Sequence, residues 1–130
     1  MILTTTLSAA AAAAIINIWL IVRCGQVRVS AKIVHGDGGN PLLARRMRAH
    51  ANFIENTPLV LILIGAIELA GKGGNWLPYV AAVYLLARVA HPIGMDREGG
   101  NPFRAGAIIV TALTLIGLAV VAVLVSLGKL

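Results

Sequence analysis

The feature that most restricts the possible folds is a long apolar segment at residues 105–127, which contains no charged side chain. A helix of about 20 apolar residues crosses the ~30 Å hydrocarbon layer of a bilayer, so this segment predicts a membrane span. Residues 2–22 form a second apolar segment of sufficient length. Residues 58–70 and 76–90 are shorter, and each must include polar flanking residues to cross. The pattern therefore predicts an all-α integral membrane four-helix bundle in one domain, residues 1–130, with spans near 2–27, 42–70, 76–92 and 103–127.

Composition and charge support this class of protein. Charged residues make up 12% of the chain, whereas a soluble domain has about 25%. The net charge of +6 is unevenly distributed, because nine of the eleven Lys and Arg residues lie in or beside the first and third connections. Cations gather on the cytoplasmic side of membrane proteins, so both termini are predicted on the non-cytoplasmic side. Some of these cations can hold anionic membrane lipid, and no nucleic-acid partner is expected.

The first apolar segment is predicted to be a permanent span rather than a cleaved signal peptide. It lacks a positive leading region, and it ends in Arg23 rather than in a small-residue cleavage site. Cys24 is the single cysteine, so no internal disulfide can form. We expect its thiol to be buried and inert. Asn17, inside this segment, is expected to form a hydrogen bond between helices rather than to touch a substrate.

A polar stripe precedes the apolar half of the helix expected at residues 42–70. At 100° per residue, Arg45, Arg48, Asn52 and Glu55 lie within roughly a quarter of the circumference, and Asn56 flanks them. Charges at membrane depth are costly, so they face protein or a water-filled cavity and mark a functional site. The stripe predicts a polar ligand, and this requires a cleft beside it.

A second polar stripe lies at the same end of the helix expected at residues 76–92. Tyr84, Arg88 and His91 share one face. Taken singly, each of these polar residues could contact the membrane surface; Arg88, for example, could extend to the lipid headgroups. Two stripes at one depth instead predict one shared site. Arg104 lies in the first turn of the last helix, where a cation opposes the helix dipole, so helix stability does not explain it. Glu68, at the far end of residues 42–70, is expected to be an interfacial carboxylate.

The residue inventory excludes several kinds of chemistry. The three histidines lie on separate elements without HxxxH or CxxC spacing, so no metal site is predicted. The chain lacks GxSxG, and the turn HGDGGNP lacks the GxxxxGK[ST] pattern of a phosphate loop. The remaining site is rich in arginine, with one carboxylate and two amides. It suits a ligand with several carboxylates and one ammonium, and its guanidiniums favour a thiolate. Glutathione matches this inventory.

Three segments carry a resemblance to a known family. RRMRAHANFIENTPL, ARVAHPIG and NPFRA resemble motifs of the MAPEG family, the membrane-associated proteins in eicosanoid and glutathione metabolism. The resemblance implies a homotrimer of four-helix bundles, with glutathione as co-substrate between adjacent subunits near the cytoplasmic face. It further implies a transferase or peroxidase in which the glutathione thiolate attacks a lipophilic electrophile or hydroperoxide that arrives from the bilayer.

The matching positions define the expected site residues. Six residues are expected to bind glutathione, namely Arg48, His50, Asn52, Glu55, Arg88 and His91. The resemblance gives Arg104 the catalytic role of stabilising the thiolate. Met95, Asn56 and His91 stand where other members have tyrosines, and Met47 stands where some have arginine.

Two other functions remain open on the sequence alone. A small four-helix multidrug-type transporter also has short helices and an intramembrane carboxylate, although its key glutamate lies in the first helix, where this chain has none. A catalytically silent thiol- or lipid-binding member of the family would carry the same motifs. The overall pattern is most similar to small bacterial members, which implies a multi-pass protein of a bacterial inner membrane.

Overall fold

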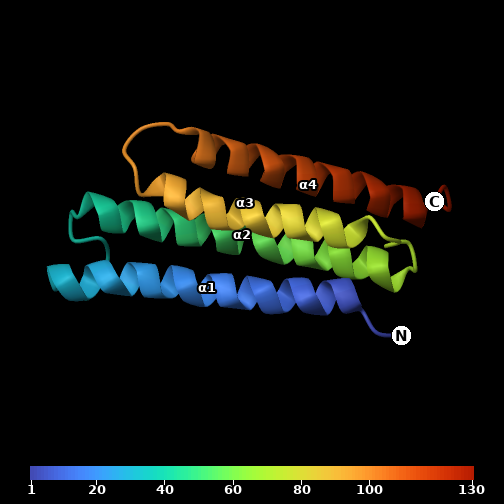
Figure 1. Cartoon of the computed structure of the whole chain (residues 1–130), viewed down its shortest axis with the longest axis horizontal. Helices are drawn as coiled ribbons and strands as arrows, with labels where there is room; N and C mark the ends of the chain where they lie inside the picture. Colours follow the sequence, from blue (N-terminus) through green and yellow to red (C-terminus); the bar gives the residue numbers. More distant parts are fainter.

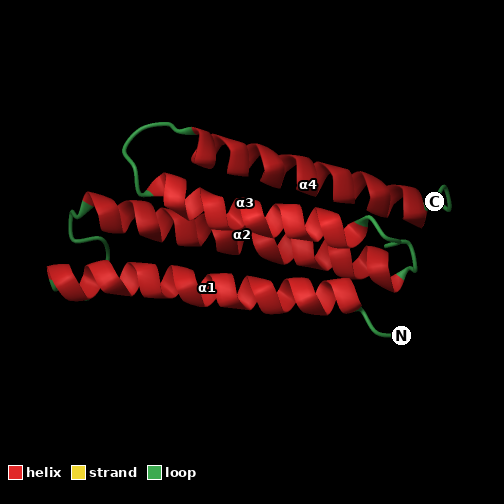
Figure 2. Cartoon of the chain, in the orientation of Figure 1, coloured by secondary structure: helices red, strands yellow, loops and turns green.

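A computed structural model describes the whole chain, residues 1–130, and contains four helices and no strand (Figure 2). The all-α prediction is confirmed, and all four helices are long and apolar enough to cross a membrane. Their bounds are α1 Thr4–Ala31, α2 Pro41–Leu69, α3 Leu77–Met95 and α4 Pro102–Ser126.

Successive helices run in opposite directions along a flat bundle (Figure 1). Both termini lie at one end, which we call the terminal end, together with the α2–α3 connection. The α1–α2 and α3–α4 connections lie at the other end, which we call the basic end. Helices α2 and α3 pack against each other in the middle, and α1 and α4 each contact both of them. Helices α1 and α4 do not contact each other.

The helix boundaries follow from local chemistry. Both α2 and α4 begin with an Asn-Pro pair: the side chains of Asn40 and Asn101 each accept a hydrogen bond from a backbone N–H three residues on, at 3.0 Å. Helix α1 continues past the predicted end at residue 27 and stops at Lys32, which adopts a left-handed conformation with φ 54°. Helix α2 continues through Pro58 without a break.

The core is divided along the bundle into three apolar clusters. The largest lies toward the terminal end and includes Val60, Ile64 and Leu77, and the smallest packs Cys24 against Leu43 at the basic end. The buried thiol agrees with the expectation for Cys24. Most other large apolar side chains are exposed on the outer faces of the helices, where a bilayer rather than water is their solvent.

Glu68 fastens the start of α1 to the end of α2 at the terminal end. Helix α1 begins without a side-chain cap of its own. The Glu68 carboxylate instead accepts the backbone N–H groups of Thr5 and Thr6, both at 2.8 Å, and the Thr6 hydroxyl at 2.6 Å. A carboxylate at a helix N-terminus satisfies free N–H groups and complements the helix dipole. Glu68 therefore serves as the cap that α1 lacks.

Candidate functional site

At the basic end, one carboxylate joins three helices. Asp96, just after α3, lies 2.6 Å from an Arg23 guanidinium nitrogen of α1 and accepts two bonds from Arg46 of α2, at 3.1 and 3.2 Å. Arg46 also donates to the Arg23 backbone carbonyl at 2.8 Å. The Arg23 guanidinium stacks over Trp19 at 4.9 Å. This cluster, which sequence reasoning did not identify, fixes the end of α3 against α1 and α2.

The interior of the bundle holds a charged group without an acidic partner. Arg88 of α3 is 1% exposed and donates to the Asn52 side-chain oxygen of α2 at 2.6 Å and to the Thr111 hydroxyl of α4 at 3.1 Å. Its Nε has no partner. Burial excludes an Arg88 side chain that extends to lipid headgroups. The two polar stripes do meet, at Arg88 and Asn52, where the amide oxygen and the hydroxyl take the place of a counter-ion.

Two further polar groups extend this buried row along α3. The hydroxyls of Tyr84 and Thr57 share a hydrogen bond of 2.9 Å toward the terminal end. His91, toward the basic end, is 2% exposed, and its Nδ1 has no partner. Unpartnered buried nitrogens are uncommon in folded proteins. The buried polar groups around Tyr84 therefore have hydrogen-bond partners, whereas the Nδ1 atom of His91 has none.

The outer surface of α2 carries an ion pair that faces away from the bundle. Arg48 and Glu55 pair at 3.3 Å, and their side chains are 62% and 54% exposed. Asn56 turns back and donates to the Asn52 backbone carbonyl at 2.8 Å. The predicted stripe is thus divided: Asn52 faces inward, whereas Arg48 and Glu55 face outward.

A cleft lies beside Glu55. An open hollow of about 650 Å³ between α1 and α2, which we call the α1–α2 hollow, is lined by polar and apolar groups that include Cys24, Arg28, Met47, His50 and Glu55. It therefore places a guanidinium, an imidazole and a carboxylate around one space.

Two side chains of the α1–α2 hollow are held by hydrogen bonds. The His50 Nε2 meets the Asn17 side-chain oxygen at 2.7 Å, which is the interhelical bond expected for Asn17. Arg28 donates to the Gly36 carbonyl at 2.7 Å. Arg28 was not identified as a site residue from the sequence, although its position among the cations in or beside the first connection could have indicated it. The bond to Gly36 fixes the guanidinium at the edge of the hollow.

The Arg104 side chain shares no hydrogen bond or ion pair with either polar region. The Arg104 backbone N–H donates to the Asn101 cap at 3.0 Å. Its side chain is exposed and forms no hydrogen bond or ion pair within the chain. The predicted residues therefore fall into three places: the interior (Asn52, Arg88, His91), the outer face and hollow of α2 (Arg48, His50, Glu55), and the start of α4 (Arg104).

Four helices long and apolar enough to cross a membrane, with several charged side-chain contacts gathered at the basic end, define a small helical membrane protein. The model of the MAPEG family matches residues 6–124, and the chain belongs to that family.

Among curated proteins, the chain is similar to the inner membrane protein YecN of Escherichia coli strain K12 and to its counterpart in Escherichia coli O6:H1 strain CFT073. Each is 28% identical over 74 residues, which cover 56% of this chain and 56% of the relative. The chain thus spans about half the length of the curated relatives it matches. No solved structure matches it.

Proposed function

We propose that this protein is a membrane-embedded glutathione transferase or peroxidase that acts on lipophilic electrophiles or hydroperoxides. The family to which it belongs includes glutathione transferases. The observation that carries the proposal is the α1–α2 hollow, where Arg28, His50 and Glu55 surround one space of about 650 Å³. Pockets for small ligands measure about 300–1,000 Å³.

The charges of the α1–α2 hollow complement those of glutathione. The tripeptide carries two carboxylates and one ammonium. Arg28 can form charge-assisted hydrogen bonds with a carboxylate, and Glu55 can receive the ammonium. His50, fixed by its bond to Asn17, adds a further polar contact. In this arrangement Arg88 has a positioning role, because it holds Asn52 from within the bundle.

The exposure of Arg48 and Glu55 supports the proposed homotrimer. These charged side chains are 62% and 54% exposed on a helix that crosses the membrane. Ionised groups are unfavourable against lipid and normally face protein or a polar cavity. A neighbouring copy packed on this face of α2 would cover them, and glutathione would then lie between adjacent subunits. We further propose that the basic end faces the cytoplasm of a bacterial cell and that both termini lie outside its inner membrane.

The chemistry of the proposed enzyme requires a glutathione thiolate. In the proposed trimer, the Arg104 guanidinium of a neighbouring copy would lie beside the glutathione between the subunits, and a nearby guanidinium favours ionisation of a thiol. In transfer, the thiolate sulfur forms a bond to an electrophilic carbon, and the leaving group departs with the electron pair of the broken bond. In peroxide reduction, two glutathione molecules are oxidised to the disulfide, while the hydroperoxide O–O bond breaks and yields an alcohol and water.

Arg104→Ala tests this role, with Arg97→Ala, in the connection just before α4, as the matched control. Arg97 stacks on Phe103 at 6.0 Å and has no assigned role. We expect Arg104→Ala to bind glutathione in isothermal titration but to lose the thiolate band in the ultraviolet difference spectrum, whereas Arg97→Ala keeps both. An unchanged thiolate band in Arg104→Ala would refute the role of Arg104.

The binding site itself is tested by titration of glutathione into Arg28→Gln and into Lys32→Gln. Both variants remove one cation from the same stretch of chain, but only Arg28 lines the α1–α2 hollow. A charge-assisted hydrogen bond contributes about 1.5–3 kcal/mol, so Arg28→Gln should weaken binding roughly 10- to 100-fold. Absence of binding to the unaltered protein would refute the proposed function as a whole.

A further inference from the structure

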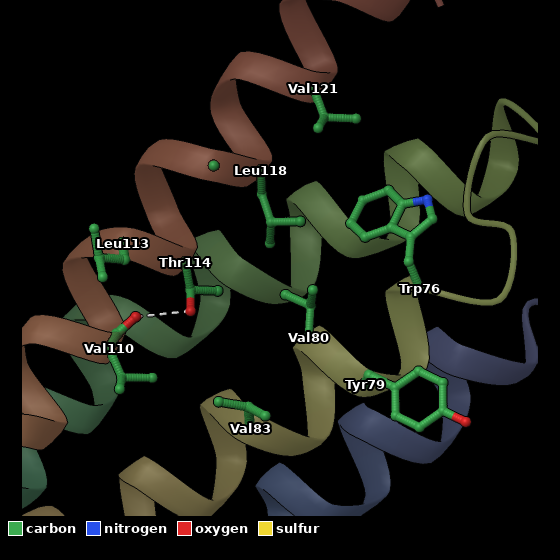
Figure 3. A pocket seen from close by; sticks show the side chains of 10 residues that line it. Trp76, Tyr79, Val80, Val83, Val110, Leu113, Thr114, Leu118 and Val121 are labelled. Atoms are coloured by element: carbon green, nitrogen blue, oxygen red, sulfur yellow. Dashed lines mark hydrogen bonds between the residues drawn. The ribbon is translucent and has the colours of Figure 1, made fainter.

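A groove on the opposite side of the bundle from α1 has no role in the proposed chemistry. It lies between α3 and α4, encloses about 480 Å³, and runs from Val110 to Val121 along α4 (Figure 3). Trp76 and Tyr79, at the start of α3, stand at its end nearest the terminal end of the bundle. We call it the α3–α4 groove.

The walls of the groove offer an occupant almost no polar contact. Its lining is apolar apart from Thr114 and the polar ends of Trp76 and Tyr79. The Thr114 hydroxyl donates to the Val110 carbonyl at 2.7 Å, so it is already satisfied by its own helix (Figure 3). Gly117 contributes no side chain to the wall, and a Cβ added there would meet no atom within 4 Å. The space therefore suits a flexible hydrocarbon chain.

The length and position of the groove match one leaflet of a bilayer. Val110 and Val121 are eleven residues apart in a helix, a distance of about 16 Å at 1.5 Å per residue. This is roughly half of the ~30 Å hydrocarbon thickness. Trp76 marks the outer limit of the groove, as tryptophans do at membrane surfaces. The groove thus extends from the middle of the membrane to the surface at the terminal end.

Two cations stand at the outer end of the groove walls. Lys72 precedes α3 and Lys129 follows α4, so each wall has one lysine beyond its end. Neither lysine pairs with an acidic side chain. Glu68, the one acidic residue at this end, is occupied by the start of α1. Both lysines therefore lie at the terminal end of the bundle, beyond the groove, and neither has an acidic side-chain partner.

We propose that the α3–α4 groove binds one acyl chain of an anionic phospholipid from the leaflet at the terminal end, with the headgroup phosphate near Lys72 and Lys129. The apolar walls hold the chain, and the lysines select for negative charge. The Trp76 indole N–H forms no hydrogen bond within the protein and can donate to the headgroup region. This inference is independent of glutathione, because it uses neither the hollow nor the interior polar row.

Trp76 provides a direct reporter for the experiment. The chain has two tryptophans, so Trp19→Phe leaves Trp76 as the only one. The full-length protein is reconstituted into vesicles with increasing fractions of phosphatidylglycerol or phosphatidylcholine that carry the same brominated acyl chain, which quenches tryptophan fluorescence on contact. Each lysine near the membrane surface favours an anionic lipid about fivefold, and two lysines multiply this preference, so half-maximal quenching should require about 25-fold less phosphatidylglycerol than phosphatidylcholine.

Three variants separate the parts of the proposal. Gly117→Leu fills the groove and should reduce quenching by both lipids. Gly106→Leu is the matched control, because it adds the same side chain to α4 outside the groove and also meets no atom within 4 Å. Quenching of Trp76 in Gly106→Leu should equal quenching in the parent protein. Lys72→Gln combined with Lys129→Gln should retain quenching but remove the preference for phosphatidylglycerol.

Two outcomes would overturn the proposal. Equal quenching by the two lipids in the parent protein would exclude a selective anionic site. If a second copy of the protein covers the groove instead, Trp76 would be shielded from both brominated lipids. In that case a cysteine placed at Leu113, in a Cys24→Ser background, would form a disulfide between two chains.

Discussion

Asp96→Asn is the substitution for which the structure gives the clearest energetic expectation. The Asp96 carboxylate lies 2.6 Å from Arg23 and receives two bonds from Arg46 at 3.1 and 3.2 Å. The three side chains are mostly covered, at 27%, 14% and 16% exposure for Asp96, Arg23 and Arg46. The substitution keeps the shape of the side chain but leaves two neighbouring guanidiniums without their shared negative charge.

The expected loss follows from the number of contacts. A hydrogen bond to a charged group contributes about 1.5–3 kcal/mol, and Asp96 makes three such contacts. Asparagine can still accept from one arginine through its single oxygen. Breaking a fully buried pair costs about 3–5 kcal/mol, and a quarter-exposed carboxylate should cost somewhat less. We therefore expect Asp96→Asn to lower the free energy of unfolding by about 3 kcal/mol.

Glu98→Gln is the matched control, because it removes the same charge two residues away in the same connection. Glu98 is 86% exposed and lies 3.8 Å from Arg45, so its loss should change the free energy of unfolding by less than about 0.5 kcal/mol. Both variants can be unfolded by sodium dodecyl sulfate titrated into detergent micelles and followed by circular dichroism. If Asp96→Asn lies within 0.5 kcal/mol of Glu98→Gln, the carboxylate does not hold the three helices together, and this reasoning is wrong.

Two further predictions concern packing and a buried bond. In Gly94→Ala the new Cβ would lie 2.7 Å from the Arg104 backbone nitrogen, which should cost about 1–3 kcal/mol in the same unfolding assay. Gly106→Ala, which meets nothing within 4 Å, should be neutral or stabilising by up to ~1 kcal/mol; equal effects would contradict the close contact. Tyr84→Phe removes a buried interhelical bond and should cost about 0.6–1.7 kcal/mol. Tyr79→Phe, 74% exposed, should cost nothing measurable, and a Tyr84 variant as stable as the Tyr79 variant would show that the bond contributes nothing.

The fold was predictable because membrane helices leave plain signals in a sequence. The length of each apolar segment defines a span, and the Asn-Pro pairs define where α2 and α4 begin. The end of α1 was placed too early, at residue 27, because the polar residues that follow do not resemble a span. They remain helical to Ala31, and this extension fixes Arg28 on α1 near the hollow.

The sequence predicted which residues belong to the candidate site, but not how they are arranged in space. Helical spacing placed Arg48, Asn52 and Glu55 on one stripe, but a quarter of a helix circumference includes residues that face in and residues that face out. Packing against α3 turns Asn52 toward Arg88, while Arg48 and Glu55 remain outside. The contacts of Asp96 could not be read from local periodicity either, because they join segments far apart in the chain.

The polar residues on the two faces of α2 differ in how accessible they are to a ligand. The interior pair, Arg88 and Asn52, is closed: the guanidinium is 1% exposed, and Thr111 supplies its second acceptor. The outer pair, Arg48 and Glu55, is open: the two exposed groups pair with each other, and Glu55 also lines the hollow. Opening the interior would break buried charge-assisted bonds, whereas inserting a charged tripeptide beside Glu55 exchanges one exposed ion pair for several new contacts. Under the proposed function, ligand chemistry therefore belongs to the outer face of α2, and the interior row has a positioning role.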